Sequence, residues 1–287
     1  MLRSDARTTL TNRKIRLART ANTVSVTVAA VWAGLLLSSC SGSSGGGAPV
    51  ASARQAVARH AVRLTATPTA RQAGRPRRDA VPISRGPAST AVATVLRSAP
   101  GYASPGGKVT GPVPASWYGR SSVLPVVATR PGWVQVRLAQ RPNGSTAWLP
   151  ASDVTLSRTP YRIVVNNTTA QLALYERGRL VFSAPAGVGT TDDPTPTGAF
   201  FVAFDEQPPQ PNPGYGPFII VTSAHSQAIS DWESSGDAII GIHGPLGEDS
   251  QIGAVGARIS HGCVRLHDEA LERLTEVPPG TPIDVVS

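Results

Sequence analysis

The stretch Ser260-His261-Gly262-Cys263-Val264-Arg265-Leu266, which follows Ile242-His243-Gly244, decides how this chain folds and what chemistry it offers. A thiolate nucleophile needs neighbouring backbone without bulky side chains, so that the substrate can approach, together with a proton acceptor and hydrogen-bond donors. The glycines and histidines of the two stretches supply these features. The opposite interpretation is a buried, inert thiol, which suits a free cysteine in apolar surroundings. His261 and Gly262 argue against such surroundings. The sequence therefore predicts covalent catalysis at Cys263.

The second cysteine, Cys40, has a separate explanation. Six basic residues precede an apolar run from about Val24 to Leu37, which is short for a membrane span. The run ends in Leu37-Ser38-Ser39-Cys40, which resembles the bacterial lipobox, where cleavage leaves a diacylglyceryl group on the thiol. We expect residues 1–39 to be a lipoprotein signal peptide and Cys40 to be lipidated, with an uncleaved anchor or ordinary secretion as alternatives. Cys263 is then left without a disulfide partner.

The formal charge of the 287 residues is +9, which suggests a nucleic-acid or membrane partner until the charges are mapped. Residues 1–40 carry +5 and residues 51–90 carry +7, whereas residues 91–287 contain 13 basic and 16 acidic side chains, a balance of −3. The basic character belongs to the leader and to the segment after it. A nucleic-acid partner therefore loses its main support.

Residues 40–90 are rich in Ala, Arg, Pro, Thr and Ser and contain no aromatic side chain. Such a composition cannot bury enough apolar surface to offset the entropy of ordering, so we expect a disordered linker. Its arginines either contact anionic lipid headgroups and wall polymers or are simply solvated. Both interpretations remain open.

Short β runs separated by turns fill residues 91–158. Val123–Val127, Trp133–Leu138 and Ala147–Pro150 are the clearest runs, and Pro142-Asn143-Gly144 marks a turn between the last two. Strict alternation in the Trp133 run predicts a hairpin on a small, half-buried sheet. The region resembles a bacterial SH3-like barrel, which we expect to form a separate small domain.

Four aromatic residues in this region are candidates for a glycan or peptide groove: Trp117, Tyr118, Trp133 and Trp148. The alternative is that they fill the core of a small barrel. We expect Trp133 and Trp148 in the core, and Trp117 and Tyr118, beside Gly119, on the surface.

Residues 160–287 again favour β structure. Expected strands are Arg162–Val165, Gln171–Tyr175, Leu180–Phe182, Ala199–Phe204, Phe218–Val221 and Ile283–Val286. A single helix is predicted from Asp268 to Val277, with Asp268 as its N-cap, Leu271 and Leu274 on one face and a Pro-Pro-Gly stop. The fold class is therefore mostly β, with one short helix.

This last region resembles the L,D-transpeptidase catalytic domain family, often called YkuD-like, and the resemblance implies its β-sandwich fold. Four elements carry the match in order: Gln171-Leu172-Ala173-Leu174-Tyr175, Thr195-Pro196-Thr197-Gly198, Ile242-His243-Gly244 and Ser260-His261-Gly262-Cys263. The sixteen residues from Gly244 to Ile259 match the spacing that family members show between the last two elements.

The resemblance implies roles for the central residues. Cys263 fits the nucleophile that attacks the third residue of a peptidoglycan tetrapeptide stem and expels the terminal D-Ala, and His243 fits its base. Gly244 would orient the imidazole through its carbonyl. The backbone N–H groups of Gly262 and Cys263 are candidate oxyanion donors. His261 is a further orienting candidate or a structural hydrogen-bonding residue.

Other polar residues have two roles open to them. Arg265 either clamps a carboxylate of the stem or braces its loop. Ser260 is a substrate contact or a turn residue, and Tyr215 and His225 lie in a segment, residues 207–232, that we expect to cover the site. His267 is expected at the surface.

The same residues allow alternative functions. His243, His261 and Cys263 are conceivable zinc ligands, but no carboxylate or paired cysteine supports a metal, so no cofactor is expected. A papain-like wall endopeptidase should place Cys before His, the reverse of the order here. An L,D-carboxypeptidase, in which water replaces the amine, and a non-catalytic wall-binding lipoprotein remain as alternatives.

The sequence thus predicts a lipid-anchored, extracytoplasmic L,D-transpeptidase on the outer face of the cytoplasmic membrane. It would form 3→3 cross-links between stem peptides, which are both donor and acceptor, through a thioester at Cys263. The resemblance also implies acylation of that thiol by carbapenem-type β-lactams. We expect a monomer that binds no nucleic acid.

Overall fold

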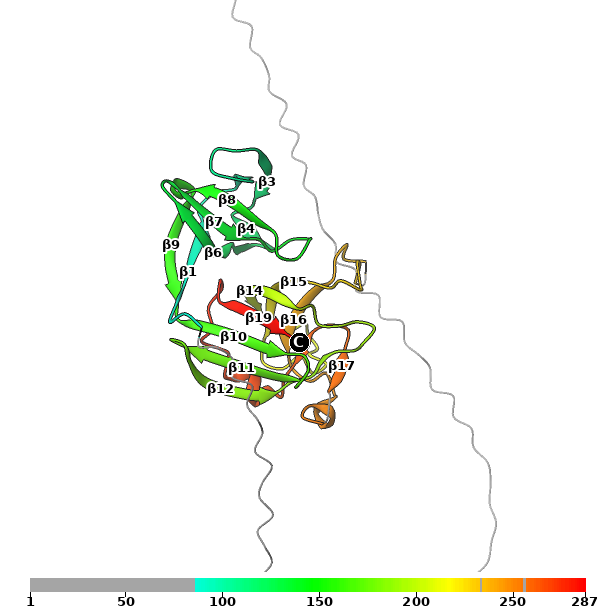
Figure 1. Cartoon of the computed structure of the whole chain (residues 1–287). Helices are drawn as coiled ribbons and strands as arrows, with labels where there is room; N and C mark the ends of the chain where they lie inside the picture. The colour runs from blue at the N-terminus through cyan, green and yellow to red at the C-terminus, as the bar shows by residue number, and fades with distance from the viewer. Residues whose placement is uncertain (1–85, 233, 255–256) are drawn as a thin grey trace, which may run out of the picture. The chain divides into compact units, whose positions relative to one another are not determined.

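The computed structural model describes residues 86–232, 234–254 and 257–287, all within one compact unit of the chain (Figure 1). The predictions for residues 1–85, including the signal peptide, Cys40 and most of the linker, lie outside the described residues. Two curled sheets account for most of the described residues, so the predicted mostly β fold is confirmed. Among the described residues, no helix is both long and apolar enough to cross a membrane.

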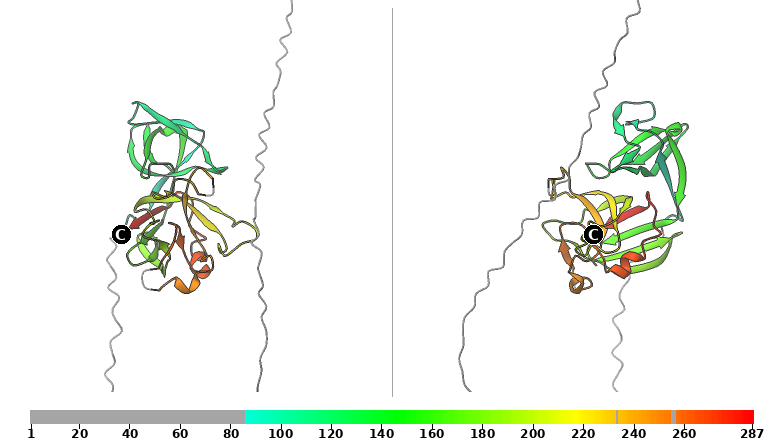
Figure 2. Two further views of the ribbon diagram at one scale, coloured as in Figure 1. Left: turned by 90° about the vertical axis from the view of Figure 1, so that its right-hand side faces the viewer. Right: turned by 180° about the vertical axis from the view of Figure 1, so that it is seen from behind.

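The first sheet has seven strands in the order β3-β2-β8-β7-β6-β1-β9, and one view of Figure 2 shows it curling around a common centre. Its strands are β1 (Thr90–Val95), β2 (Ala99–Tyr102), β3 (Val109–Val113), β6 (Val123–Arg130), β7 (Trp133–Arg137), β8 (Thr146–Pro150) and β9 (Val154–Thr159). A two-stranded hairpin, β4 (Ser116–Trp117) and β5 (Arg120–Ser121), and the 3-10 turn η1 (Ala151–Asp153) complete this region. Its likeness to an SH3-like barrel stays a prediction.

The second sheet has eight strands in the order β12-β11-β10-β19-β14-β15-β16-β18. They are β10 (Tyr161–Asn166), β11 (Gln171–Glu176), β12 (Arg179–Pro185), β14 (Gly198–Glu206), β15 (Ile219–His225), β16 (Ile239–His243), β18 (Val264–Arg265) and β19 (Pro282–Val286). The pairs β10–β19 and β16–β18 are parallel and the others antiparallel. Outside it lie β13 (Val188–Gly189), which pairs with β17 (Arg258–Ser260), the 3-10 turn η2 (Asp249–Gln251) and α1 (Asp268–Glu272).

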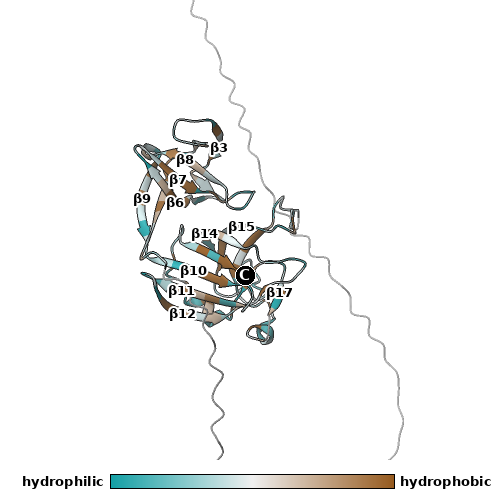
Figure 3. Ribbon diagram, in the orientation of Figure 1, coloured by the Kyte–Doolittle hydropathy of each residue, from teal (hydrophilic) through white to brown (hydrophobic). Residues whose placement is uncertain are grey.

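Hydrophobic periodicity predicted the strands well. The hairpin of β7 and β8 is confirmed, and the buried residues of β7 alternate with partly exposed ones. All six strands expected after residue 160 are present, with ends that differ by a few residues. Figure 3 shows hydrophobic segments on many strands next to hydrophilic ones, as expected for strands with one face on a core and the other toward solvent.

The predicted helix is shorter than expected. It ends at Glu272, and its N-cap is His267 without a side-chain cap, so Asp268 belongs to the first turn instead. The chain continues in turns to Val277. Leu271 and Leu274 are nevertheless fully buried, as their spacing predicted. The helix and the turns that follow it bury the same face, so the hydrophobic pattern could not show at which residue the helix ends.

The four aromatic residues of the first region divide differently from the prediction. Trp148 is buried, and Trp133, partly buried, packs edge to face on Tyr102 at 5.2 Å between ring centroids. Tyr118 is 66% exposed, as expected. Trp117 is only partly exposed, so its predicted surface position is wrong: it packs against the core of the seven-stranded sheet.

The two sheets share hydrophobic core, which the sequence did not predict. Phe201, Ala203 and Phe204 belong to β14 of the eight-stranded sheet, yet their side chains pack in one cluster with Leu124, Val136, Leu149 and other residues of the seven-stranded sheet. The opposite face of β14 places Phe200 and Val202 in the core of the second sheet. β14 therefore joins the two regions.

Replacing Phe201, which is 1% exposed, tests this shared core. Phe201→Ala should lower the free energy of unfolding by about 3–5 kcal/mol, because it leaves a cavity between the sheets. Urea unfolding of the full-length protein, followed by circular dichroism, measures the change. Leu180→Ala, at a side chain 56% exposed, is the control and should change stability little. An equally small loss for Phe201→Ala would contradict the packing.

Candidate active site

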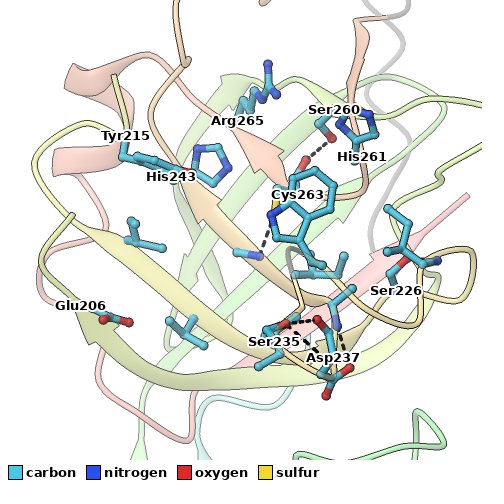
Figure 4. A pocket seen from close by; sticks show the side chains of 18 of the residues that line it. Glu206, Tyr215, Ser226, Ser235, Asp237, His243, Ser260, His261, Cys263 and Arg265 are labelled. Atoms are coloured by element: carbon cyan, nitrogen blue, oxygen red, sulfur yellow. Dashed lines mark hydrogen bonds between the residues drawn. The ribbon is translucent and has the colours of Figure 1, made fainter. Parts of the chain in front are cut away.

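The parallel pairing of β16 with β18 brings the two predicted catalytic residues together. Ile242 lies opposite Val264 and His243 opposite Arg265, so Gly241 and Cys263 come side by side, each one residue earlier. The Gly241 N–H donates to the Cys263 Sγ at 3.4 Å. In Figure 4 the Cys263 side chain lies between those of His243 and His261. Strand register thus creates a site from residues about twenty apart in the chain.

The His243 ring is buried and held in one orientation. Its Nδ1 lies 2.8 Å from the Gly244 carbonyl oxygen, a contact that requires Nδ1 to carry the proton and leaves Nε2 as the acceptor. Tyr215 packs on the ring edge to face at 5.1 Å between centroids. The predicted orienting role of Gly244 agrees with this geometry.

Gly244 is also sterically required. Its N–H donates to the Tyr215 carbonyl oxygen at 2.7 Å. A Cβ at this position would come within 2.6 Å of the Gly216 amide nitrogen and 2.7 Å of the Gly214 carbonyl oxygen. The segment that carries Tyr215 therefore packs directly on the backbone that orients the imidazole.

Burial keeps both reacting groups neutral in the free protein. Desolvation lowers the pKa of His243 to about 4, against the hydrogen bond with Gly244, and the Arg265 charge lowers it further. Desolvation also raises the pKa of the Cys263 thiol, while the Gly241 N–H and Arg265 act in the opposite direction. At neutral pH the pair is thus a thiol beside a neutral imidazole, able to transfer its proton as the sulfur attacks.

The turn before the nucleophile is fixed by Ser260. Its buried hydroxyl donates to the Cys263 carbonyl oxygen at 2.5 Å and accepts from the Gly262 N–H at 3.1 Å. Gly262 has φ +117°, a conformation that favours glycine. Its N–H donates to Ser260, whereas the Cys263 N–H has no hydrogen-bond partner among the described residues. Of the two predicted oxyanion donors, the Cys263 N–H is therefore the free one.

The Thr195-Pro196-Thr197-Gly198 stretch braces the same turn. Thr195 is buried, and its hydroxyl donates to the Gly262 carbonyl oxygen at 2.8 Å and accepts from the Gly189 N–H at 2.9 Å. The Asn167 side chain donates to the Thr195 carbonyl oxygen at 2.9 Å. The sequence marked this stretch only as a break between strands and as part of the resemblance.

Arg265 lines the site but is already paired. Its guanidinium contacts the Glu248 carboxylate, and its Nε is buried without a hydrogen-bond partner among the described residues. The two side chains form an ion pair at the edge of the site. Glu248 came from no motif, because it lies seventeen residues away in the loop after β16.

His261 lies at the rim of the site. Its side chain is 61% exposed, with Nε2 3.8 Å from the Asp193 carboxylate. The Trp232 ring packs beside it at 5.3 Å between centroids. His267, expected at the surface, is partly exposed and bonded to Asp249 at 2.8 Å.

A cavity of about 340 Å³ opens over the nucleophile. Several predicted residues line it: Cys263, His243, Ser260, His261, Arg265 and Tyr215. Much of the remaining wall comes from the loop between β15 and β16, which contributes Ser226, Ile229, Trp232, Ser235 and Asp237. The lining is largely apolar, as is usual for ligand pockets. Within the described residues, no three His, Cys, Asp or Glu side chains converge as metal ligands.

His225 does not belong to this cavity. It is 2% exposed, and its Nδ1 lies 2.7 Å from the Asp237 carboxylate. Burial lowers its pKa, against the attraction of Asp237. Its backbone pairs with Asn143, through an N–H to Oδ1 bond of 3.0 Å and an Nδ2–H to carbonyl bond of 2.7 Å. The residue therefore anchors the pocket loop instead of facing substrate.

Arg141 completes this anchor from the turn between β7 and β8. Its guanidinium donates to the Asp237 carboxylate at 2.9 Å and to the carbonyl oxygens of Ser226 and Ile229 at 2.6 and 3.0 Å. No pattern in the sequence linked this turn with residues 226–237, because the contacts span more than eighty positions.

The site combines a cysteine and a histidine of fixed tautomer in an apolar cavity, an arrangement typical of enzymes that use a thiol nucleophile. The profile of the family described as YkuD, L,D-transpeptidase catalytic domain, matches residues 160–285. A Bacillus licheniformis protein named L,D-transpeptidase YkuD is 38% identical over 127 residues, which cover 44% of this chain and 66% of that protein. The Bacillus subtilis protein named L,D-transpeptidase YqjB is 30% identical over 146 residues, covering 48% and 77%.

The chain belongs to the YkuD family of L,D-transpeptidase catalytic domains. It spans just under two thirds of the first relative's length. Solved structures include an L,D-transpeptidase from Mycobacterium smegmatis, with 18% identity, 54% of this chain and 91% of that chain covered, and a TM-score of 0.35. The catalytic domain of the E. faecium enzyme has 20% identity, 44% and 95% coverage, and a TM-score of 0.32. Because these structural scores are low, the assignment depends on the sequence matches.

The neutral state of Cys263 can be tested by alkylation. Iodoacetamide should modify it more slowly at neutral pH than free cysteine, with a rate that rises about tenfold per pH unit beyond the ordinary thiol range, because burial raises its pKa. Peptide mass spectrometry follows Cys263 separately from Cys40. A fast rate that stays flat from acidic to neutral pH would reveal a preformed thiolate and contradict this electrostatic description.

Arg141→Ala tests the anchor of the pocket loop. Loss of its three hydrogen bonds should lower the protection of residues 226–237 in hydrogen exchange, with a local loss of roughly 1 kcal/mol, while β16 stays protected. Arg130→Ala, at an exposed arginine on β6 of the same sheet, serves as the control. Unchanged exchange in the loop would show that it is ordered without Arg141.

Proposed function

We propose that this protein is a peptidoglycan L,D-transpeptidase that forms 3→3 cross-links between stem peptides through a thioester at Cys263. The observation that carries the proposal is the fixed His243 tautomer beside the Cys263 thiol, within a domain of the YkuD family. Donor and acceptor are both stem peptides. No group outside the chain and its substrates is needed to balance the reaction.

In the first half-reaction, Nε2 of His243 accepts the thiol proton while Sγ attacks the carbonyl carbon of the third stem residue. The Gly241 N–H, 3.4 Å from Sγ, stabilises negative charge on the sulfur. The intermediate collapses, the C–N bond to D-Ala breaks, and the imidazolium returns its proton to the leaving amine. A thioester remains on Cys263.

In the second half-reaction, an amine of another stem attacks the thioester carbonyl. His243 takes the proton that the amine loses, and the thiolate leaves and regains a proton from the imidazolium. The product is an amide between two stems, with one D-Ala released per cross-link. If water attacks instead, the same acyl-enzyme gives tripeptide, which is the L,D-carboxypeptidase alternative. A non-catalytic wall-binding role would leave the Cys-His arrangement without use.

The proposed place of action is the outer face of the cytoplasmic membrane. The lipobox-like Leu37-Ser38-Ser39-Cys40 and the apolar run before it support a lipid anchor, and the segment that follows would serve as a tether to the wall. The anchor is supported by sequence alone. Labelling cells with a radioactive fatty acid should mark the wild-type chain and leave Cys40→Ala unmarked.

Product analysis tests the catalytic proposal. The purified full-length protein, mixed with a disaccharide-tetrapeptide, should yield a dimer that lacks one D-Ala, as measured by mass spectrometry. Cys263→Ala should abolish the product and keep the fold, and His243→Gln should lower kcat by about 10²–10⁴-fold, the usual contribution of a general base. Dimer formation by Cys263→Ala would refute the mechanism, and tripeptide without dimer would favour the carboxypeptidase.

Acylation by a carbapenem gives an independent readout of the same thiol. Sγ would add to the β-lactam carbonyl and open the ring, so the mass of the protein should rise by that of one intact inhibitor molecule. The adduct should be absent from Cys263→Ala. An adduct of unchanged yield in that variant would place the reactive group elsewhere.

A further inference from the structure

One aromatic side chain of the seven-stranded region reaches the catalytic cavity. Tyr118 lies between β4 and β5, and its side chain lines the same cavity as Cys263 and His243. It is 66% exposed, so most of its surface is open to solvent and to a bound ligand. Neither the family match, which begins at residue 160, nor the catalytic residues account for it.

The backbone at this position is unfavourable for tyrosine. Tyr118 has φ +48° and Gly119 φ +75°, the left-handed pair of a two-residue hairpin turn in which Asn and Gly are preferred. A bulky side chain in this region costs about 1 kcal/mol or more. The exposed ring recovers little of that cost by burial. Strain of this kind is commonly retained at sites that contact ligands.

The hairpin is nevertheless held firmly by Trp117. Its ring packs edge to face on Phe204 at 5.8 Å between centroids and lies 6.3 Å from the ring of His225. The Tyr118 ring lies 5.3 Å from Trp117 and 6.3 Å from Phe204. Trp117 thus anchors the turn in the shared core, while Tyr118 is presented on an ordered support.

The charges along the cavity indicate what this end accepts. At the thiol end, the Arg265 charge is paired with Glu248. Phe204 lies beside Tyr118, and the lining also includes the exposed carboxylate of Glu206, which Figure 4 shows apart from the catalytic residues. An aromatic face in a cavity that also carries a carboxylate favours neutral or cationic groups with apolar surface and disfavours the carboxylates of a stem peptide.

We propose that Tyr118 is a substrate-contacting residue whose ring binds the muropeptide away from the reacting peptide bond. The proposal rests on the function proposed above. Residues 91–158 then contribute a wall of the catalytic site, instead of acting only as a separate wall-binding module. The contact should stabilise the bound substrate and the transition state equally. It should therefore affect the affinity for large substrates and leave the chemistry at Cys263 unchanged.

Affinity is measured without turnover by titrating a disaccharide-tetrapeptide into full-length Cys263→Ala in a calorimeter. Adding Tyr118→Ala should raise Kd by roughly 3- to 10-fold, the effect of losing one aromatic contact. Tyr118→Phe should stay within about twofold, because it keeps the ring. Arg120→Ala, an exposed position in the same hairpin that does not line the cavity, is the matched control and should leave Kd unchanged.

Turnover and alkylation separate the possible outcomes. In the protein that keeps Cys263, Tyr118→Ala should raise KM and leave the rate of Cys263 alkylation by iodoacetamide unchanged. The inference would be overturned if Cys263→Ala carrying Tyr118→Ala and Cys263→Ala carrying Arg120→Ala had equal Kd values while the wild type turned over normally. The proposed function would then still stand. A slower alkylation in Tyr118→Ala would also overturn it, since the role would then be structural. Absence of both muropeptide binding and turnover in the wild-type protein would overturn both proposals.

Discussion

The parallel pairing of β16 with β18 is the constraint on which the site depends. It places Gly241 beside Cys263 and His243 beside Arg265, so the nucleophile, a donor to its sulfur and the base are set by strand register. A slip of one residue would turn every side chain of β18 to the other face. The short strand β18 is in turn held by the Ser260 turn and by the exchange of two backbone hydrogen bonds between Arg265 and Gly187, each 2.8 Å.

This arrangement combines a desolvated thiol with a desolvated imidazole. Burial weakens His243 as a base, with a pKa of about 4, and also weakens the thiol as an acid. The two effects favour the neutral pair in the resting state, so in the proposed mechanism proton transfer accompanies attack on the carbonyl. The hydrogen bond from Nδ1 to Gly244 becomes stronger when the ring is charged, and it stabilises the imidazolium at that moment. Catalysis then depends on a preorganised backbone more than on a preformed thiolate.

Local patterns predicted the parts of the structure that local chemistry determines. Alternation located β7, motif and resemblance located Cys263 and His243, and Gly244 was assigned the orienting role that its 2.8 Å contact supports. What the sequence did not predict depends on long-range packing. Arg141 and Glu248 are ordinary exposed residue types whose partners lie far along the chain or outside any motif. Trp117 was expected at the surface because no pattern shows that Phe204 would cover it.

The missed contacts of Arg141 and Trp117 share one physical cause, which is that β14 serves two cores at once. Phe201 and Phe204 face the seven-stranded sheet, while Phe200 faces the core of the catalytic sheet. The continuous apolar run of this strand predicts two buried faces but does not say what covers the second. Because the seven-stranded sheet covers it, the hairpin with Trp117 and Tyr118 comes to the edge of the cavity, and the turn with Arg141 comes to the pocket loop. A domain boundary drawn from composition near residue 159 therefore divides a hydrophobic core and a cavity wall to which both sides contribute.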